Sequence, residues 1–456
     1  MQTYILDNYV MKMIYNGWIK TLFFLGVTIG LLLFNGYVYK LFRHNDVRTF
    51  SKAGGNSFGE APPLSGAVFL GKKIRRYNGP TVFSNKEMVS KFIKEYSGTK
   101  KGSGKYCKQW AVVTTIFEPS KALKLMADVP DWCLVIVGDK KSPSDFMAKL
   151  GTKASTVYLD VKQQESLGFE FEDKTPWNHF ARKNVGFIYA IQHGAEVIFD
   201  FDDDNELFNS ETKITPPNYD IGEARKITCE KPDAFNVYSV LEPSVPGSWP
   251  RGYPLRRILD PCPSTETKVT LKNWAVIQPA ANNNPDVDAI YRLTRPIPFN
   301  FELNTIPVTF GKHTYVPYNA QTTLHNKNSF WGLLLPCTVH GRVTDIWRSY
   351  FAQRIFMEHD LPFVYTAPQV TQFRNPHNIL GDLESEGDLY FKSEQLVSFL
   401  SNWKPSSNYI PSQMEELYIE LYERDYLDEF DIPYLQLWLK SLAAVGYDFN
   451  VSKNRN

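Results

Sequence analysis

The chain has 456 residues, of which 43% are hydrophobic and 22% are charged. Such a chain can bury one large core or two smaller ones, so its composition excludes a protein that is disordered throughout. Its 50 Lys and Arg residues nearly cancel its 49 Asp and Glu residues. A net charge of +1 gives no general attraction to nucleic acid, so we expect no nucleic-acid partner and look for function in local features.

The first local feature is an uncharged, apolar run over residues 21–39, bracketed by Lys20 and Lys40. At about 1.5 Å per residue, a helix of this length crosses the hydrocarbon core of a bilayer. We predict a short tail over residues 1–20 and a transmembrane anchor over residues 21–39, with a cleaved signal peptide or a buried soluble helix as alternatives. More basic residues follow the run than precede it, and by the positive-inside rule alone this places the C-terminal part in the cytosol.

Residues 40–105 have the composition of a stem or linker, with Gly and Pro pairs, a basic stretch at 72–76 and little apolar periodicity. Ser84 and Glu87 have the spacing of a capping box, and apolar residues at helical spacing follow them. We therefore expect one short amphipathic helix near the end of the stem.

An α/β pattern begins at residue 110. The expected strands cover 110–116, 132–137, 157–159 and 196–201, and the expected helices cover 119–127 and 178–193. The order of strand, helix and strand predicts parallel neighbours in one sheet. Much further along the chain, residues 413–444 are again expected to be helical.

The last of these strands runs into Asp200, Asp202, Asp203 and Asp204, four carboxylates within five positions. Carboxylates packed this closely favour either full solvation, as in an exposed acidic turn, or a hard divalent cation such as Mg²⁺ or Mn²⁺. Because an uninterrupted apolar strand precedes them, we favour the metal site.

Two other strands also end in polar groups. Thr114 and Thr115 end the first strand, and Asp139 follows the second. Ligands of open parallel sheets bind beyond the carboxyl ends of the strands, so these residues are candidates for a nucleotide's base and ribose. Arg182 and Lys183, on the helix before the acidic strand, are candidates for its diphosphate. The alternatives are a simple turn residue at Asp139 and an exposed helical face at Arg182 and Lys183.

Six separated blocks of the chain, in the same order, resemble the STELLO-type proteins, a family of Golgi-anchored glycosyltransferases of plants with nematode and algal relatives. The blocks are QWAVVTTIFEP, DWCLVIVGDKKSP, YLDVKQQESLGF, PWNHFARKNVGFIYAIQHGAEVIFDFDDDNEL, NPDVDAIYRLTR and GRVTDIWRSYFAQRIF.

The resemblance implies a GT-A-like, Rossmann-like domain with a mixed, mostly parallel sheet over residues 106–395, followed by a helical extension over 396–456. It implies a nucleotide-sugar donor, a glycan or glycoprotein acceptor, and a single-pass type II protein of the Golgi membrane whose C-terminal domain is luminal, in contrast to the charge count. A homodimer or a complex with other Golgi enzymes is a further expectation. The D-x-D element of such folds maps onto Asp202 and Asp204, with Asp200 and Asp202 as the alternative register.

An inverting transferase also needs a base for the acceptor hydroxyl. Asp345 stands near the start of a predicted helix, where its position resembles that of GT-A catalytic carboxylates, although a helix-start Asp is also a common cap. Asp286 and Asp288 form a second D-x-D, which we interpret as capping or acceptor-side residues. His340 and His325 are weaker candidates for the metal shell.

Two other functions are compatible with the sequence. One is a catalytically silent GT-A scaffold that organises other Golgi enzymes. The other is a haloacid-dehalogenase-like phosphatase, with Asp200 as nucleophile and Asp202 as acid. The five cysteines have no C-x-x-C spacing, so no zinc site is expected; their odd number leaves at least one thiol unpaired within the chain.

Overall fold

We describe the fold from a computed structural model. It covers residues 73–100, 102, 104, 106–151, 153–208 and 221–450. The predicted tail and membrane anchor (residues 1–39) and the stem up to residue 72 lie outside the described residues. Within the described ranges, no helix is both long enough and apolar enough to cross a membrane.

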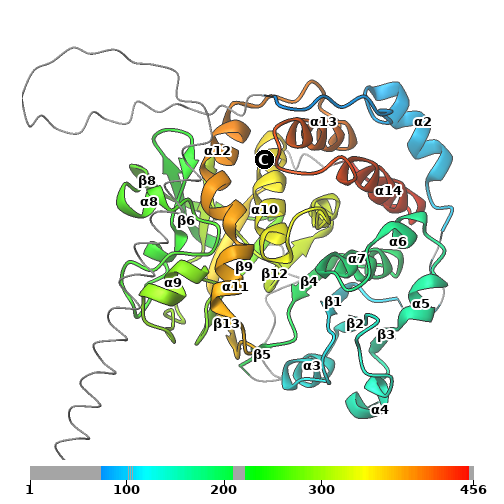
Figure 1. The fold of residues 1–456 in the computed structure, drawn as a ribbon, viewed down its shortest axis with the longest axis horizontal. Helices are drawn as coiled ribbons and strands as arrows, with labels where there is room; N and C mark the ends of the chain where they lie inside the picture. Colours follow the sequence, from blue (N-terminus) through cyan, green and yellow to red (C-terminus); the bar gives the residue numbers. More distant parts are fainter. Residues whose placement is uncertain are drawn as a thin grey trace, which may run out of the picture. The chain divides into compact units, whose positions relative to one another are not determined.

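A large mixed sheet organises the α/β unit (Figure 1). Its strands lie in the order β3-β2-β1-β4-β12-β9-β13-β10-β6-β8, with β5 paired to β13. The first four strands are parallel, and β12 joins them to the second half through antiparallel pairs with β4 and β9. The strands are β1 (Gln109–Thr114), β2 (Cys133–Val137), β3 (Thr156–Leu159), β4 (Val197–Phe201), β5 (Asn205–Leu207), β6 (Gly222–Cys229), β8 (Ser264–Leu271), β9 (Val276–Asn282), β10 (Val308–Phe310), β12 (Thr322–Asn326) and β13 (Phe363–Gln372), with β7 (Asp233–Ala234) and β11 (Thr314–Tyr315) in a separate pair.

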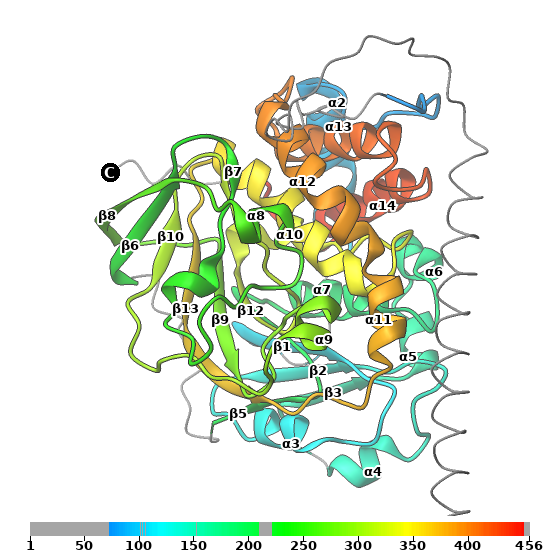
Figure 2. The same cartoon turned by 60° about the vertical axis from the view of Figure 1, so that its left-hand side comes forward.

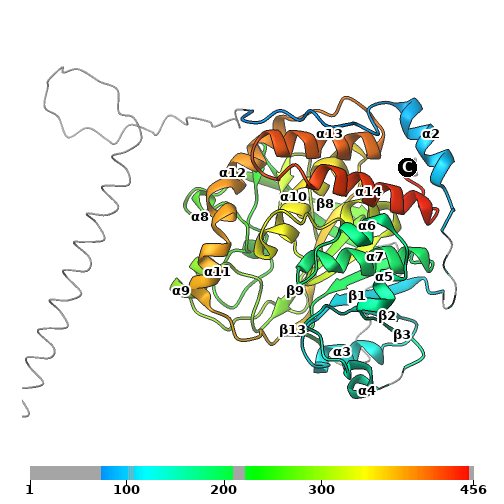
Figure 3. The ribbon, with the colours of Figure 1, turned by 45° about the vertical axis from the view of Figure 1, so that its right-hand side comes forward.

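Helices cover both faces of the parallel half of this sheet. In Figure 3, α5, α6 and α7 lie on one side of β1, β2 and β3, and α3 and α4 lie on the other. This arrangement confirms the expected Rossmann-like α/β architecture. The helices are α2 (Lys86–Tyr96), α3 (Lys121–Ala127), α4 (Phe146–Leu150), α5 (Val161–Glu165), α6 (Glu170–Lys174), α7 (Lys183–Gln192), α8 (Arg256–Leu259), α9 (Ala289–Thr294), α10 (Gly341–Glu358), α11 (Ile379–Ser385), α12 (Gly387–Asn402), α13 (Ile410–Glu423) and α14 (Asp431–Ala444).

The central strands are buried on both faces, and their side chains alternate between two cores. In β1, Trp110 and Val112 pack into the core on the α7 side, whereas Ala111 and Val113 pack into the core on the α3 side. In β4, Ile198 faces the first core and Phe199 the second. This period of two explains why these strands are continuous apolar runs in the sequence.

The end of the predicted stem lies against the C-terminal helices. Ile74 N donates a hydrogen bond to Glu423 O (2.8 Å), and Lys73 forms an ion pair with the Glu423 carboxylate (2.7 Å). The helix expected next is α2, but Asn85, not Ser84, caps it, because the Asn85 side chain accepts from Met88 N (3.0 Å). The described residues therefore belong to one compact unit that includes α12, α13 and α14. The proposed boundary at residue 395 stays a prediction.

Two disulfides link parts of this unit. Cys107 pairs with Cys133 and Cys229 pairs with Cys262, with Cα atoms 6.2 Å and 5.8 Å apart. Cys337 is the free thiol. Disulfides persist in oxidising compartments and are rare in the cytosol.

Candidate functional site

A cavity of 390 Å³ lies at the carboxyl ends of β1, β2 and β4. Residues at the ends of these parallel strands, at the start of α10 and after β13 line much of it, and residues 178–180, Arg251, Asp286 and Gln321 complete the lining. The polar lining residues are Thr114, Thr115, Asp139, Lys141, Asn178, His179, Asp202, Asp203, Asp204, Arg251, Asp286, Gln321, His340, Arg342, Asp345, Gln372, Arg374, Asn375 and His377. The cavity is therefore where the strand-end rule predicts a ligand.

Three neighbouring carboxylates form the acidic part of this lining. Burial raises the pKa of Asp202 to about 7, against the effect of Lys183, and Asp204 adds to the increase. Burial, and then repulsion from Asp203, raise the pKa of Asp204 to about 6. The Asp202 side chain keeps 34% of its surface exposed, and its Oδ1 accepts from Lys183 Nζ at 3.0 Å. Asp204 thus raises the pKa of Asp202, and Asp203 that of Asp204, as expected of carboxylates that would share a cation.

Asp200 lies beneath the cavity and not in it. Its carboxylate has no exposed surface and pairs with two buried cations, Lys183 Nζ at 2.7 Å and Arg348 NH1 at 3.0 Å. His325 Nε2 lies 4.0 Å from Asp200 and is equally buried, and burial holds the pKa of His325 well below its usual value. The structure thus brings neither Asp200 nor His325 to the cavity.

The residues expected at the other strand ends do line the cavity. Thr115 donates to Asp203, and Thr114 donates to the Val137 carbonyl at 3.0 Å. Asp139 Oδ1 accepts from two backbone groups, Lys140 N (2.6 Å) and Asn178 N (2.9 Å). Asp139 therefore fixes the loop after β2 against the segment before α7, and this structural role exists whether or not a nucleotide binds.

Asp345 also lines the cavity, but as part of a buried network. It is the fifth residue of α10, whose N-cap is His340, so Asp345 is not a cap. Arg251 donates to Asp345 Oδ2 (2.9 Å) and also to both carboxylate oxygens of Asp286 (2.8 and 3.0 Å). Burial alone would raise the pKa of Asp286, but Arg251 and then Arg342 hold it well below its usual value. Asp288, in contrast, caps α9 by accepting from Tyr291 N at 2.7 Å, as expected.

The donor set of this site suits a cation that needs few protein ligands. Among the described residues there is no group of three or more His, Cys, Asp or Glu side chains arranged to hold a metal ion. Mg²⁺ is usually bound through one or two carboxylates, with phosphate and water oxygens completing the shell. Asp202 and Asp204 fit that role, since both line the cavity and Asp204 raises the pKa of Asp202.

Comparisons with known proteins agree with the resemblance. Residues 342–455 match the family model described as STELLO glycosyltransferases. The chain is 28% identical over 351 residues to "Probable glycosyltransferase STELLO2" of Arabidopsis thaliana and 27% identical over 358 residues to "Probable glycosyltransferase STELLO1". The chain is similar in sequence to the STELLO glycosyltransferases. Each alignment covers 74% of this chain and 45% of the relative, so the chain spans about half the length of the curated relatives that it matches.

Arg182 and Lys183 are buried inside the fold. Arg182 has no exposed surface, and it donates to Glu172 Oε1 (2.7 Å) and to Gln164 Oε1. Burial would lower the pKa of Lys183, but Asp200 and Asp202 raise it. Neither Arg182 nor Lys183 lines the cavity, so the structure offers no diphosphate contact to either side chain.

The segment after β13 supplies polar residues, among them the cation Arg374, that the sequence analysis did not identify. Phe373 N donates to the carbonyl of Asp204 at 2.9 Å, which places Arg374, Asn375 and His377 beside the acidic cluster, and all three line the cavity. A polar run, RNPH, directly after a strand was the available signal, and it is the same signal that identified the ends of β1, β2 and β4.

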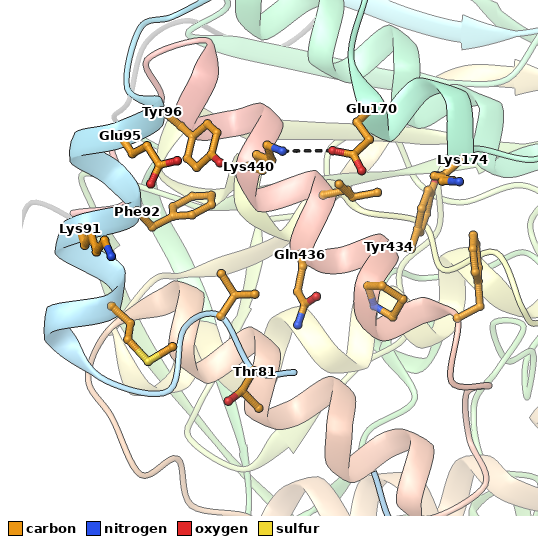
Figure 4. Close-up of a pocket in the computed structure, with 15 residues that line it drawn as sticks. Thr81, Lys91, Phe92, Glu95, Tyr96, Glu170, Lys174, Tyr434, Gln436 and Lys440 are labelled. Carbon is orange, nitrogen blue, oxygen red and sulfur yellow. Dashed lines mark hydrogen bonds and ion pairs between the residues drawn. The ribbon is translucent and has the colours of Figure 1, made fainter. Parts of the chain in front are cut away.

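A larger cavity of 750 Å³ lies between α2, α6 and α14 (Figure 4). Apolar side chains form much of its wall, and the ion pair between Lys440 and Glu170 crosses it at 3.0 Å. Its lining includes no acidic cluster and none of the residues expected to bind a nucleotide, so it is not the candidate active site despite its size.

Proposed function

We propose that the chain is a metal-dependent glycosyltransferase with a GT-A-like domain, which moves a sugar from a nucleotide-sugar donor to a glycan or protein acceptor. One observation carries the proposal: a single cavity is lined by Thr114, Thr115, Asp139, Asp202, Asp204 and Asp345, of which the first and the last lie more than 200 residues apart in the chain.

In this proposal Asp202 and Asp204 hold Mn²⁺ or Mg²⁺ at the carboxyl end of β4. When bound, the cation offsets the negative charge that develops on the departing nucleoside diphosphate. Arg374 replaces Arg182 and Lys183 as the protein cation nearest to that diphosphate. Burial, and then the neighbouring Arg342, lower the pKa of Arg374, so an anion placed against these two guanidinium groups would relieve their repulsion.

Asp345 is the proposed base for the acceptor hydroxyl if the reaction inverts the anomeric centre. Its carboxylate faces the cavity and is only 4% exposed, which limits competition from water. Arg251 fixes its orientation through two contacts, Oδ1 at 3.1 Å and Oδ2 at 2.9 Å. Arg251 is thus a positioning residue, and it also fixes the orientation of the Asp286 carboxylate through two hydrogen bonds.

The proposed location is the Golgi lumen, behind an anchor at residues 21–39. The two disulfides support an oxidising compartment, and this is the opposite of what the positive-inside count predicts. The sequon Asn450-Val451-Ser452 provides a test, because Asn450 is exposed. Sensitivity of the chain to an endoglycosidase, lost in Asn450→Gln, would establish luminal exposure; if the sequon is not used, protection of the domain from protease in sealed vesicles decides the topology.

The transferase is tested by thermal stabilisation of the chain with Mn²⁺ and a panel of nucleotide sugars. We expect at least one donor to raise the melting temperature only with Mn²⁺, and the double variant Asp202→Ala with Asp204→Ala to lose this effect. The matched control replaces two exposed acids outside the cavity, Glu87→Ala with Glu165→Ala, and keeps it. Absence of stabilisation by every donor would refute the proposal and favour the silent scaffold.

The phosphatase alternative needs Asp200 as an exposed nucleophile. Asp200 is fully buried between Lys183 and Arg348, so its carboxylate cannot reach a phosphate in the cavity. We therefore do not propose this activity.

A further inference from the structure

The large sheet ends in an unusually regular edge at β8. β8 pairs with β6 along all eight of its residues, from Ser264 opposite Cys229 to Leu271 opposite Gly222, without a bulge. Figure 2 shows β8 as the outermost strand beside β6. Residues 264–268 are exposed, and no described strand pairs with the other edge of β8. This edge therefore presents a row of backbone N–H and C=O groups that a further strand can pair with.

Proteins often protect such edges with a lysine, and β8 contains one, Lys268. Here Glu266, two positions away, lies on the same face of the strand. Glu266 and Lys268 are 49% and 80% exposed. On that face Lys268 contacts Glu223 of β6 (3.2 Å), and Glu266 contacts Arg225 of β6 (3.6 Å). The strand pair β6–β8 therefore already carries alternating charges.

We propose that β8 pairs antiparallel with β8 of a second copy of this chain, around a two-fold axis at Thr267. In this register Glu266 lies opposite the partner's Lys268, and Lys268 lies opposite the partner's Glu266. β8 is thus complementary in charge to a second β8. Lys268, which would disfavour pairing with other strands, lies opposite a carboxylate when the partner is another copy of β8. The alternating charges of β6 and β8 in one copy then continue across the interface into β8 and β6 of the other.

The rest of the edge suits the same occupant. The opposite face of β8 carries Thr265, Thr267 and Val269, β-branched residues that favour a paired strand. No proline interrupts β8, and the disulfide Cys229–Cys262 closes the ribbon just before the strand begins. The pairing uses no residue of the 390 Å³ cavity, so it is independent of the proposed transferase.

Disulfide trapping on membranes that carry the full chain tests the register. Thr267→Cys places a thiol on the two-fold axis, so we expect a covalent dimer on a non-reducing gel. Thr270→Cys is the matched control, because its two thiols would be separated by about six residues of strand, about 20 Å. The unmodified chain controls for Cys337. Equal trapping of Thr267→Cys and Thr270→Cys, or none of either, would overturn the proposal.

Charge reversal tests the pairing without a cross-link. Glu266→Lys turns two symmetry-related attractive pairs into repulsive ones and should weaken dimerisation about thirtyfold, from about 1 kcal/mol for each pair. Lys268→Glu should have the same effect, and the double variant should restore the dimer. Sedimentation of the full chain in detergent measures all three. If both single variants dimerise like the unmodified chain, or if the double variant is monomeric, the β8 interface is wrong; a chain that is monomeric without substitution overturns it directly.

Discussion

Asp200→Asn separates the structural carboxylate of the acidic run from the proposed metal ligands. Asparagine keeps the shape of aspartate but removes the charge that neutralises Lys183 and Arg348, both of which are buried. Removing one partner from a buried ion pair costs about 3–5 kcal/mol, because the remaining charge stays out of water without compensation. We therefore expect Asp200→Asn to be strongly destabilised.

The expected shift in melting temperature follows from the size of the folded unit. Ala67–Asn456 is one unit of 390 residues. With an unfolding entropy of about 2.1 cal/mol/K for each residue, the unit loses about 0.8 kcal/mol of stability per kelvin near its melting temperature. A loss of about 3–5 kcal/mol then lowers the melting temperature by about 4–6 °C.

The control is Asp202→Asn, two positions along the same strand end. The Asp202 side chain is 34% exposed and Lys183 keeps its closer contact to Asp200, so the melting temperature without metal should change by less than 2 °C, from about 1 kcal/mol or less for a partly exposed pair. Differential scanning fluorimetry with and without Mn²⁺ measures both variants. Asp202→Asn should lose the stabilisation by metal and donor, and Asp200→Asn should keep it from its lower starting temperature. Loss of the stabilisation in both variants would favour Asp200 and Asp202 as the D-x-D pair, and its retention in Asp202→Asn would refute Asp202 as a ligand.

The remaining predictions concern single residues of the site and its support. Asp345→Asn should lower turnover with an accepted donor at least a hundredfold and leave donor-induced stabilisation unchanged. Asp286→Asn should lower the stability of the fold and reduce turnover less. An equal loss of turnover in the two variants would refute Asp345 as the base. Arg374→Gln should raise about tenfold the concentration of nucleoside diphosphate that gives half of the maximal thermal stabilisation. Arg182→Gln should instead lower the melting temperature and leave this concentration unchanged. The opposite pattern would show that Arg182, and not Arg374, contacts the diphosphate. Burial raises the pKa of Asp288 to about 6 from 3.8, so the folded state binds this proton more tightly and its ionisation costs about 3 kcal/mol at neutral pH. Between pH 7 and pH 4 the unmodified chain should therefore gain stability relative to Asp288→Asn, and parallel stability curves would contradict the shift.

Much of the parallel half of the sheet could be predicted from the sequence. The expected strands at 110–116, 132–137 and 196–201 correspond to β1, β2 and β4, because strands buried on both faces are continuous apolar runs. The second half was not predicted. β13 pairs with β5, β9 and β10. The most distant of these partners, Asn205 and Gln372, lie 167 residues apart in the chain, and periodicity gives no signal for such pairing.

The site was predictable where it depends on strand ends and unpredictable where it depends on burial. Thr114, Thr115 and Asp139 line the cavity because parallel strands end at one edge of the sheet. Arg182 and Lys183 looked like an exposed basic pair on a helix. They are instead enclosed, because Arg182 neutralises the buried Glu172 and Lys183 neutralises the buried Asp200, and both acids lie outside α7.

The period of two in β4 explains why one acidic run has two functions. Ile198 and Asp200 point to the α7 side of the sheet, where Asp200 meets Lys183 and, from α10, Arg348. Asp202 continues the same face just past the end of the strand, so it reaches both Lys183 and the cavity. Lys183 thereby connects a buried carboxylate to a proposed metal ligand at 2.7 Å and 3.0 Å. Because movement of this lysine toward the cavity would break its buried ion pair with Asp200, Lys183 fixes the position of Asp202 before any cation binds, and such preorganisation favours binding.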